Sequence, residues 1–184
     1  MARPIHTLES LHVLLADGRV RSAAEVLSGL DASPATLSRL VAADARGPAR
    51  IERIGAARAT RYALRRYVRG AGSRWPLWRM HEDGRVQALG ELIALAGGGW
   101  RVDADHHAPA WLIGGHRDGL FDDLPWWLQD VRPQGFLGRA LAHREARALG
   151  VPEDPRLWNA DDQVRRLAHD GRDLPGCLGV GDPP

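Results

Sequence analysis

The sequence contains no lysine and a single cysteine, Cys177. One cysteine excludes an internal disulfide framework, as is usual in a reducing compartment, and we expect Cys177 to be a small buried apolar residue. No charge-free stretch approaches the roughly 18 residues that span a bilayer, and the first six residues lack the apolar core of a signal peptide. These absences predict a cytoplasmic protein that does not insert into a membrane.

All 25 basic residues are arginine, and they are unevenly distributed. Up to Gly70, twelve arginines face six acidic residues, which gives +6. The remainder has thirteen arginines and seventeen acidic residues, which gives −4. Halves of opposite charge indicate different partners. The exclusive use of arginine is also what GC-rich codons produce, so the argument rests on where the arginines lie.

The chain is long enough for two small domains. Residues 70–73 (Gly-Ala-Gly-Ser) have the composition of a short linker, and all seven tryptophans follow it. We therefore expect an α+β protein with one domain at residues 1–70 and a second, small mixed α/β domain at residues 74–184.

Two helices are predicted at the start of the first domain. The first has three leucines on one face at helical spacing and ends near residues 17–18: Leu8, Leu11 and Leu15. The second begins with the capping-box spacing of Ser22 and Glu25, and Gly29 suits the left-handed position at its end.

A third helix and a hairpin complete this domain. Ser33 is a suitable N-cap and Pro34 a suitable first helical residue. The apolar stripe of the helix is expected from Leu37, Leu40 and Val41. Two short strands at residues 50–54 and 60–64, joined by a loop at 55–59, then form the hairpin.

This order predicts a winged helix-turn-helix that binds double-stranded operator DNA. The third helix would enter the major groove, with Arg39 bonding guanine, and the hairpin would lie along the phosphates as the wing. Nine arginines and two acidic residues lie between Arg39 and Arg69. The residues expected to contact DNA are Ser33, Thr36, Ser38, Arg39, Arg58, Arg61 and Arg65. The alternative is a three-helix module docked on its neighbour, with solvated arginines.

The second half predicts a hairpin at residues 75–81 and 85–89 around the turn at 82–84. A short helix at 91–96 and one strand at 111–113 follow. A helix at residues 136–149 is expected to end at Gly150, and a last helix to run from Asn159 to Gly171. The residues expected to face inward from the first of these two helices are Leu137, Ala140, Leu141 and Ala148.

Two runs of the second half resemble HipA-family toxin kinases. Residues 120–139 (LFDDLPWWLQDVRPQGFLGR) resemble the end of that family's N-terminal subdomain, and residues 171–180 (GRDLPGCLGV) resemble its passage into the kinase core. Residues 58–64 and 75–77 are similar to the branch that carries its own DNA-binding module. The resemblance implies a winged helix followed by a HipA N-terminal subdomain. The chain contains no glycine-rich loop followed by lysine, so we do not expect a kinase or a cofactor.

Split relatives in that family imply a HipS-like antitoxin that represses its operon and neutralises a separately encoded HipA-like kinase. One alternative is the regulatory part of a truncated kinase toxin. Another is a stand-alone repressor whose second domain dimerises or senses a ligand. On DNA we expect a homodimer.

Partner contact is expected from Phe121, Trp126, Trp127 and Arg132. Adjacent tryptophans on a helix do not both face one core, and tryptophan is a favoured interface residue. The alternative is that both pack at an irregular loop. A further cluster, Asp103, Asp105, His106, His107 and His116, matches no metal-binding spacing, and we interpret it as a solvated loop. No spacing indicates a catalytic acid and base, so no catalytic or metal site is expected.

Overall fold

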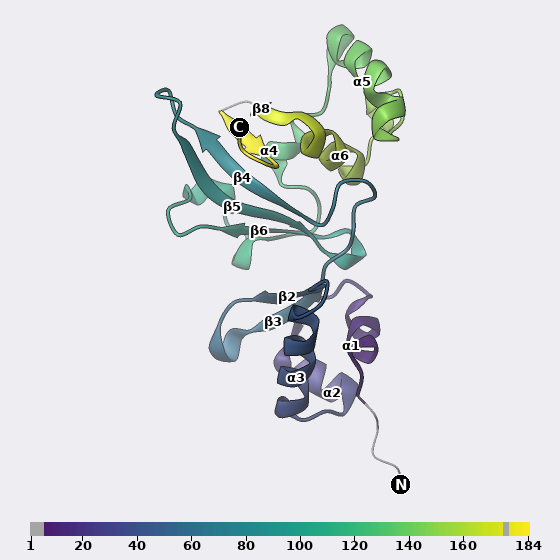
Figure 1. Ribbon diagram of the computed structural model, residues 1–184, viewed down its shortest axis with the longest axis vertical. Coiled ribbons are helices and arrows are strands. Elements are labelled where there is room, and N and C mark those ends of the chain that lie inside the picture. Colours follow the sequence, from purple (N-terminus) through teal and green to yellow (C-terminus); the bar gives the residue numbers. More distant parts are fainter. Residues whose placement is uncertain (1–5, 175–176) are drawn as a thin grey trace. The chain divides into compact units, whose positions relative to one another are not determined.

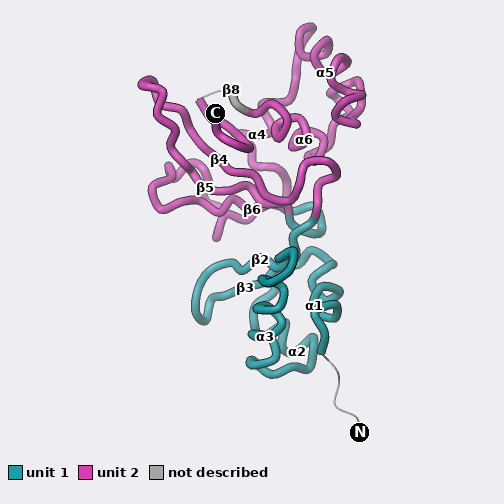
Figure 2. Tube along the Cα trace, viewed as in Figure 1, with its two compact units in different colours: residues 1–66, 95–99 teal, residues 67–94, 100–184 magenta. Residues whose placement is uncertain are grey.

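The computed structural model describes residues 6–174 and 177–184. In these ranges the chain is a mixed α+β protein with six α-helices and two antiparallel sheets (Figure 1). It divides into two compact units (Figure 2). Unit 1 comprises Met1–Arg66 and Leu95–Gly99, and unit 2 comprises Tyr67–Ala94 and Trp100–Pro184.

Three helices begin unit 1 at the predicted places: α1 (Leu8–Leu15), α2 (Ala23–Leu30) and α3 (Pro34–Ala45). Each begins after a hydroxyl residue whose side chain accepts a backbone N–H: Thr7, Ser22 and Ser33. The capping box is complete, and the hydrogen bonds from the Ser22 side chain and backbone lower the pKa of Glu25. The core of the unit contains Leu11, Leu15, Val26, Leu37 and Leu40.

The predicted role of Gly29 is wrong. Asp31 takes the left-handed conformation after α2, with φ 51°, and Gly29 lies within the helix. A Cβ on Gly29 would lie 2.9 Å from Leu14 Cδ1, so the missing side chain allows α1 to approach α2 closely.

The sheet of unit 1 has three antiparallel strands in the order β1-β3-β2. The predicted hairpin is confirmed as β2 (Ile51–Ile54) and β3 (Arg61–Leu64), with the one-turn 3-10 helix η1 (Ala57–Ala59) in its loop. Sequence reasoning missed β1 (Arg21–Ser22), which pairs with β3 directly before α2. The sheet therefore ties the hairpin to the start of α2.

Residues 95–99 belong to unit 1 although the 28 residues before them, Tyr67–Ala94, belong to unit 2. The backbone of Gly97 approaches Gly18, where a Cβ would lie 2.5 Å from Gly97 Cα. Ala96 joins the apolar core of the unit, and Leu95 pairs with Arg65 in an isolated bridge. This insertion is supported by close backbone packing that side chains at Gly18 or Gly97 would prevent.

Unit 2 contains a six-stranded antiparallel sheet in the order β7-β6-β5-β4-β9-β8. The predicted hairpin is confirmed. The expected helix at 91–96 is wrong, because Glu91–Ala94 extends the second strand of the hairpin. The structure also has strands that were not predicted, at 100–104, 120–121, 171–174 and 178–180. The strands are β4 (Arg74–Met80), β5 (Val86–Ala94), β6 (Trp100–Ala104), β7 (Leu120–Phe121), β8 (Gly171–Leu174) and β9 (Leu178–Val180).

The main core of unit 2 lies against this sheet. A row of paired residues, Trp75, Leu92 and Val102, crosses β4, β5 and β6, and each member is buried. Helices α4 (Trp126–Gln129) and α6 (Ala160–Asp170) add Trp127, Leu128, Val164 and Leu167. As predicted, α6 begins after Asn159, which forms a capping box with Asp162.

Helix α5 (Gly135–Leu149) ends as predicted at Gly150, which has φ 64°. The predicted inward face is wrong. Ala142 and Ala146 are buried in a small cluster with Val151 and Trp158, whereas Leu137 is 80% exposed. The 3-10 helix η5 (Pro155–Leu157) packs against this helix.

Other predictions in unit 2 also need correction. Residues 111–113 do not form a strand, because Ala110–Leu112 is the 3-10 helix η3. Cys177 is exposed instead of buried. Two further 3-10 helices are η2 (Ala96–Gly98), in unit 1, and η4 (Arg117–Gly119). Residues 1–5 and 175–176 lie outside the described residues. The prediction that the chain lacks a signal peptide rests partly on the first range, and the resemblance of residues 171–180 rests partly on the second. In the described ranges, every helix is too short or too polar to span a bilayer.

Candidate nucleic-acid interface

The start of α3 is held by its own hydroxyl groups. Ser33 Oγ accepts from the Thr36 backbone N–H at 3.2 Å and lies 3.0 Å from Thr36 Oγ1. These contacts satisfy part of the exposed helix terminus and fix its first turn. Ser33 and Thr36 therefore position the helix on which Ser38 and Arg39 are exposed.

Three exposed arginines lie on α3 and the hairpin of unit 1. Arg39 lies on α3, Arg53 on β2 and Arg58 in η1 at the hairpin loop. Within the described residues, none of the three guanidinium groups forms a hydrogen bond or ion pair. Their guanidinium groups thus retain full donor capacity for an external anion.

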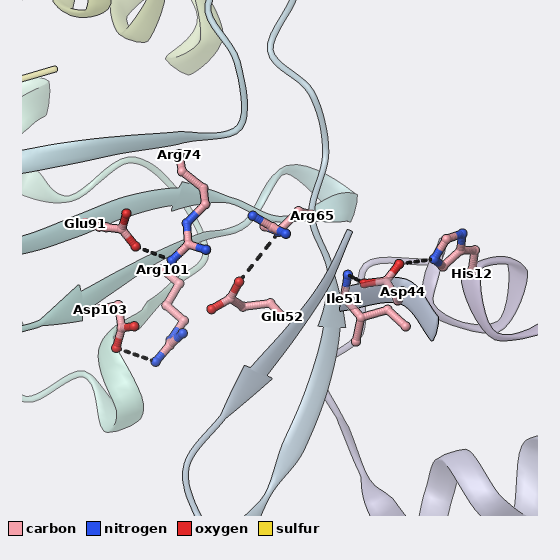
Figure 3. Close-up of polar contacts among 9 residues, drawn as sticks. All are labelled: His12, Asp44, Ile51, Glu52, Arg65, Arg74, Glu91, Arg101 and Asp103. Atoms are coloured by element: carbon pink, nitrogen blue, oxygen red, sulfur yellow. Dashed lines mark hydrogen bonds and ion pairs between the residues drawn. The ribbon is translucent and has the colours of Figure 1, made fainter. Parts of the chain in front are cut away.

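The two acidic residues on α3 and the hairpin, Asp44 and Glu52, are buried and directed inward (Figure 3). Asp44 on α3 accepts from the Ile51 backbone N–H at 2.7 Å and lies 2.9 Å from His12 Nε2. Glu52 Oε2 lies 3.7 Å from Arg65 Nε. Neither carboxylate is therefore exposed beside the arginines of α3 and the hairpin.

The remaining predicted arginines differ in accessibility. Arg61 on β3 is half-buried and pairs in register with Ile54 and Ser22. Arg65 is 9% exposed and faces Glu52, as Figure 3 shows. An outside phosphate would have to compete with this buried ion pair for Arg65, so Arg65 is not available to the proposed interface.

A groove of about 400 Å³ lies between α2, α3 and the hairpin. Its walls are mostly aliphatic, and Ser38, Arg53 and Tyr62 supply polar atoms. Arg53 pairs in register with Tyr62 across β2 and β3. Sequence reasoning missed Arg53, because Ile51, Glu52 and Ile54 are all buried and β2 has no regular alternation that would mark its exposed position.

The residues predicted to contact a protein partner do not form one surface. Phe121 and Trp127 are buried, whereas Trp126 is 58% exposed. Trp127 Nε1 donates to the Leu112 carbonyl at 3.1 Å. The Arg132 guanidinium faces the Gln163 amide. With its oxygen turned toward Arg132, the amide accepts a hydrogen bond from Arg132 Nε at 2.7 Å. In the described part of the chain, Trp126 alone of the four has a side chain that is both exposed and without a polar contact.

The side chains of the histidine-rich segment, residues 103–116, make separate contacts and do not converge on one site. Asp103 accepts from Arg101 at 2.6 Å, and the His116 ring stacks on Phe121 with centroids 4.0 Å apart. His106 and His107 lie against each other, with centroids 3.6 Å apart. In the described ranges, no group of three or more histidine, cysteine or acidic side chains is arranged to hold a metal ion.

A family model described as "YjjJ-like toxin, middle domain" matches residues 71–184. The chain is also 38% identical over 163 residues to the protein named Toxin YjjJ of Escherichia coli (strain K12), a match that covers 88% of this chain. Because this match is longer than the middle-domain match, it includes residues before Ala71. The chain spans about a third, 34%, of the length of that relative. No solved structure matches the chain.

These matches correct three predictions. The resemblance to HipA-family kinases and to a HipS-like antitoxin is wrong, because the matching family is the YjjJ-like one. The expected role as antitoxin, repressor and kinase inhibitor is also wrong, because the family and the relative are both named as toxins. The two alternatives, a truncated HipA-like kinase and a stand-alone regulator, are not supported either. The family model matches more than half of the sequence, which shows instead that the chain belongs to the YjjJ-like toxin family.

Proposed function

We propose that unit 1 is a winged-helix module that binds double-stranded DNA, joined in this chain to the middle domain of a YjjJ-like toxin. In this proposal α3 enters the major groove and the β2–β3 hairpin is the wing. Three short helices followed by an antiparallel hairpin support the assignment. The module would supply DNA binding to a toxin and not to an antitoxin.

The observation that carries the proposal is the separation of charge on α3 and the hairpin of unit 1. Arg39, Arg53 and Arg58 are exposed and lack partners among the described residues. Asp44 and Glu52 are buried against internal partners. The exposed arginines therefore present a positive surface along α3 and the hairpin, which favours a polyanion.

The position of each side chain suggests its role. Arg39 lies on the exposed side of α3, where a guanidinium can donate two hydrogen bonds to guanine O6 and N7. Arg53 and Arg58 lie on the hairpin and would contact phosphates irrespective of base sequence. Ser38, five residues after Ser33, would contact either a base or a phosphate.

We propose that the 184 residues bind DNA and contribute no catalytic step themselves. The toxin name of the relative applies to a protein about three times as long as the matched region. The toxic effect named for the relative would then depend on the two thirds of its length outside this match.

The test is fluorescence anisotropy of the full chain with a labelled random-sequence duplex at several salt concentrations. We expect the logarithm of the association constant to fall linearly with the logarithm of the salt concentration. Arg53→Gln and Arg58→Gln should each weaken binding and reduce the salt slope by about 1. Arg85→Gln removes an exposed arginine from the β4–β5 turn of unit 2 and is the matched control. Binding that is absent, or that changes equally in all three variants, would reject the proposal.

A further inference from the structure

A second basic site lies wholly within unit 2. A cavity of about 400 Å³ is formed by the loop before α5, the first turn of α5 and η5. Three of its lining residues are arginines, Arg132, Arg139 and Arg156, and the others are proline, glutamine and glycine. Among the described residues, no carboxylate lines the cavity, so its walls concentrate positive charge in a concave space.

One of the three arginines is neutralised by an acid. Arg156 donates through Nε and Nη2 to both carboxylate oxygens of Asp154, at 2.6–3.0 Å. This pairing lowers the pKa of Asp154 to about 2 and keeps the carboxyl ionised. The Arg156 side chain is 82% exposed, and its Nη1 lies outside the pair.

The other two arginines retain their charge. Arg132 faces the neutral amide of Gln163, which orients the guanidinium without neutralising it. Arg139 is exposed and forms no hydrogen bond or ion pair in the described part of the chain. The cavity therefore combines one guanidinium group oriented by Gln163 with two on exposed side chains. One carboxylate offsets one of the three charges, so a net charge of about two remains uncompensated.

The backbone at the start of α5 has the same polarity. The helix has 15 residues, its N-cap Gln134 forms no side-chain cap, and its first turn contains no acidic residue. Free N–H groups at such a helix end favour negative charge. Here they add to a cavity that the arginines already make electropositive.

We propose that this cavity binds a phosphate group through Arg132, Arg139 and Arg156. Guanidinium groups match the geometry of phosphate oxygens and donate paired hydrogen bonds to them. The phosphate would belong either to a small phosphorylated molecule or to a nucleic acid. The inference is independent of the DNA-binding role of unit 1, because each lining residue belongs to unit 2.

Isothermal titration calorimetry of the full chain with inorganic phosphate, at constant ionic strength in chloride, tests the site. We expect saturable binding that Arg139→Gln weakens about tenfold, the size expected for loss of a charge-assisted hydrogen bond. Arg147→Gln removes an exposed arginine from the last turn of the same helix, outside the cavity, and should leave binding unchanged. Asp154→Asn should strengthen binding, because it removes the acid that neutralises Arg156.

The thermal unfolding of each variant is recorded to confirm that it is folded. No saturable heat above that of chloride, or equal binding by the Arg139→Gln and Arg147→Gln variants, would overturn the proposal. Repeating the duplex titration identifies the source of the phosphate. Weaker DNA binding by Arg139→Gln would indicate a nucleic-acid phosphate, and unchanged DNA binding a small molecule.

Discussion

His12 Nε2 on α1 lies 2.9 Å from Asp44 Oδ1 on α3. The second oxygen of Asp44 accepts the backbone N–H of Ile51, the first residue of β2. One carboxylate, 3% exposed at its side chain, therefore joins the first helix, the proposed recognition helix and the hairpin (Figure 3). We therefore expect the orientation of α3 relative to the proposed wing to depend on this contact.

We expect Asp44→Ala to destabilise unit 1 by about 2–3 kcal/mol. The substitution leaves the buried Ile51 N–H without its acceptor and removes a packed polar side chain. Urea unfolding followed by circular dichroism measures the loss, and His12→Ala is expected to cost less because the Ile51 contact survives. A change below about 0.5 kcal/mol would show that the Asp44 contacts do not hold the unit together.

Ser33→Ala is expected to destabilise α3 by about 1 kcal/mol, because Thr36 N–H loses its side-chain acceptor. Ser33→Asn retains a capping oxygen and should stay close to the parent in urea unfolding. If the alanine variant is fully stable but binds duplex DNA more weakly, Ser33 contacts DNA directly instead of positioning the helix.

Local signals in the sequence were sufficient for most of unit 1. Hydroxyl caps, Pro34 and the leucine spacing determine α1 to α3 within a few residues, and these signals act over one helical turn. The two-residue strand β1 was missed, because its partner β3 lies about 40 residues further along the chain. Short-range pattern does not encode such a long-range pairing.

Unit 2 was predicted less completely for the same reason. Residues 91–94 have helix-favouring composition, but pairing with both β4 and β6 makes them a strand. On α5 the aliphatic residues indicated an inward face, whereas alanines at 142 and 146 are the buried ones. The arginine cavity depends on residues from two segments, 132–139 and 155–156, and no single motif marks it.

The two adjacent tryptophans should respond differently to alanine substitution. Trp127 is 7% exposed and donates to the Leu112 carbonyl, so Trp127→Ala should cost about 3–5 kcal/mol. Trp126 is 58% exposed, so Trp126→Ala should change the free energy of unfolding by less than about 0.5 kcal/mol. Urea unfolding of both variants checks this, and equal losses would contradict the assigned environments.

Arg156→Gln should raise the pKa of Asp154 from about 2 towards its ordinary value of 3.8, because the Arg156 side-chain hydrogen bonds are the largest cause of the shift. The folded pKa is depressed, so the pair stabilises the fold above about pH 3.8, and this contribution is lost as the pH falls through about 2. Carboxyl-detected NMR titration of parent and variant measures both midpoints. An unchanged Asp154 midpoint in the variant would assign the shift to the backbone of residue 156.

Binding of the full chain to a specific duplex is expected to involve two copies. DNA-reading helices of this kind commonly act in pairs on half-sites about one helical turn apart, and a two-fold protein dimer matches a palindromic site. Sedimentation velocity of the complex with a labelled duplex gives its mass directly. The matched measurement uses a duplex that carries a single half-site, where the second copy should be lost and the affinity should fall. A complex of one chain per duplex on the complete site would show that unit 1 binds DNA as a monomer.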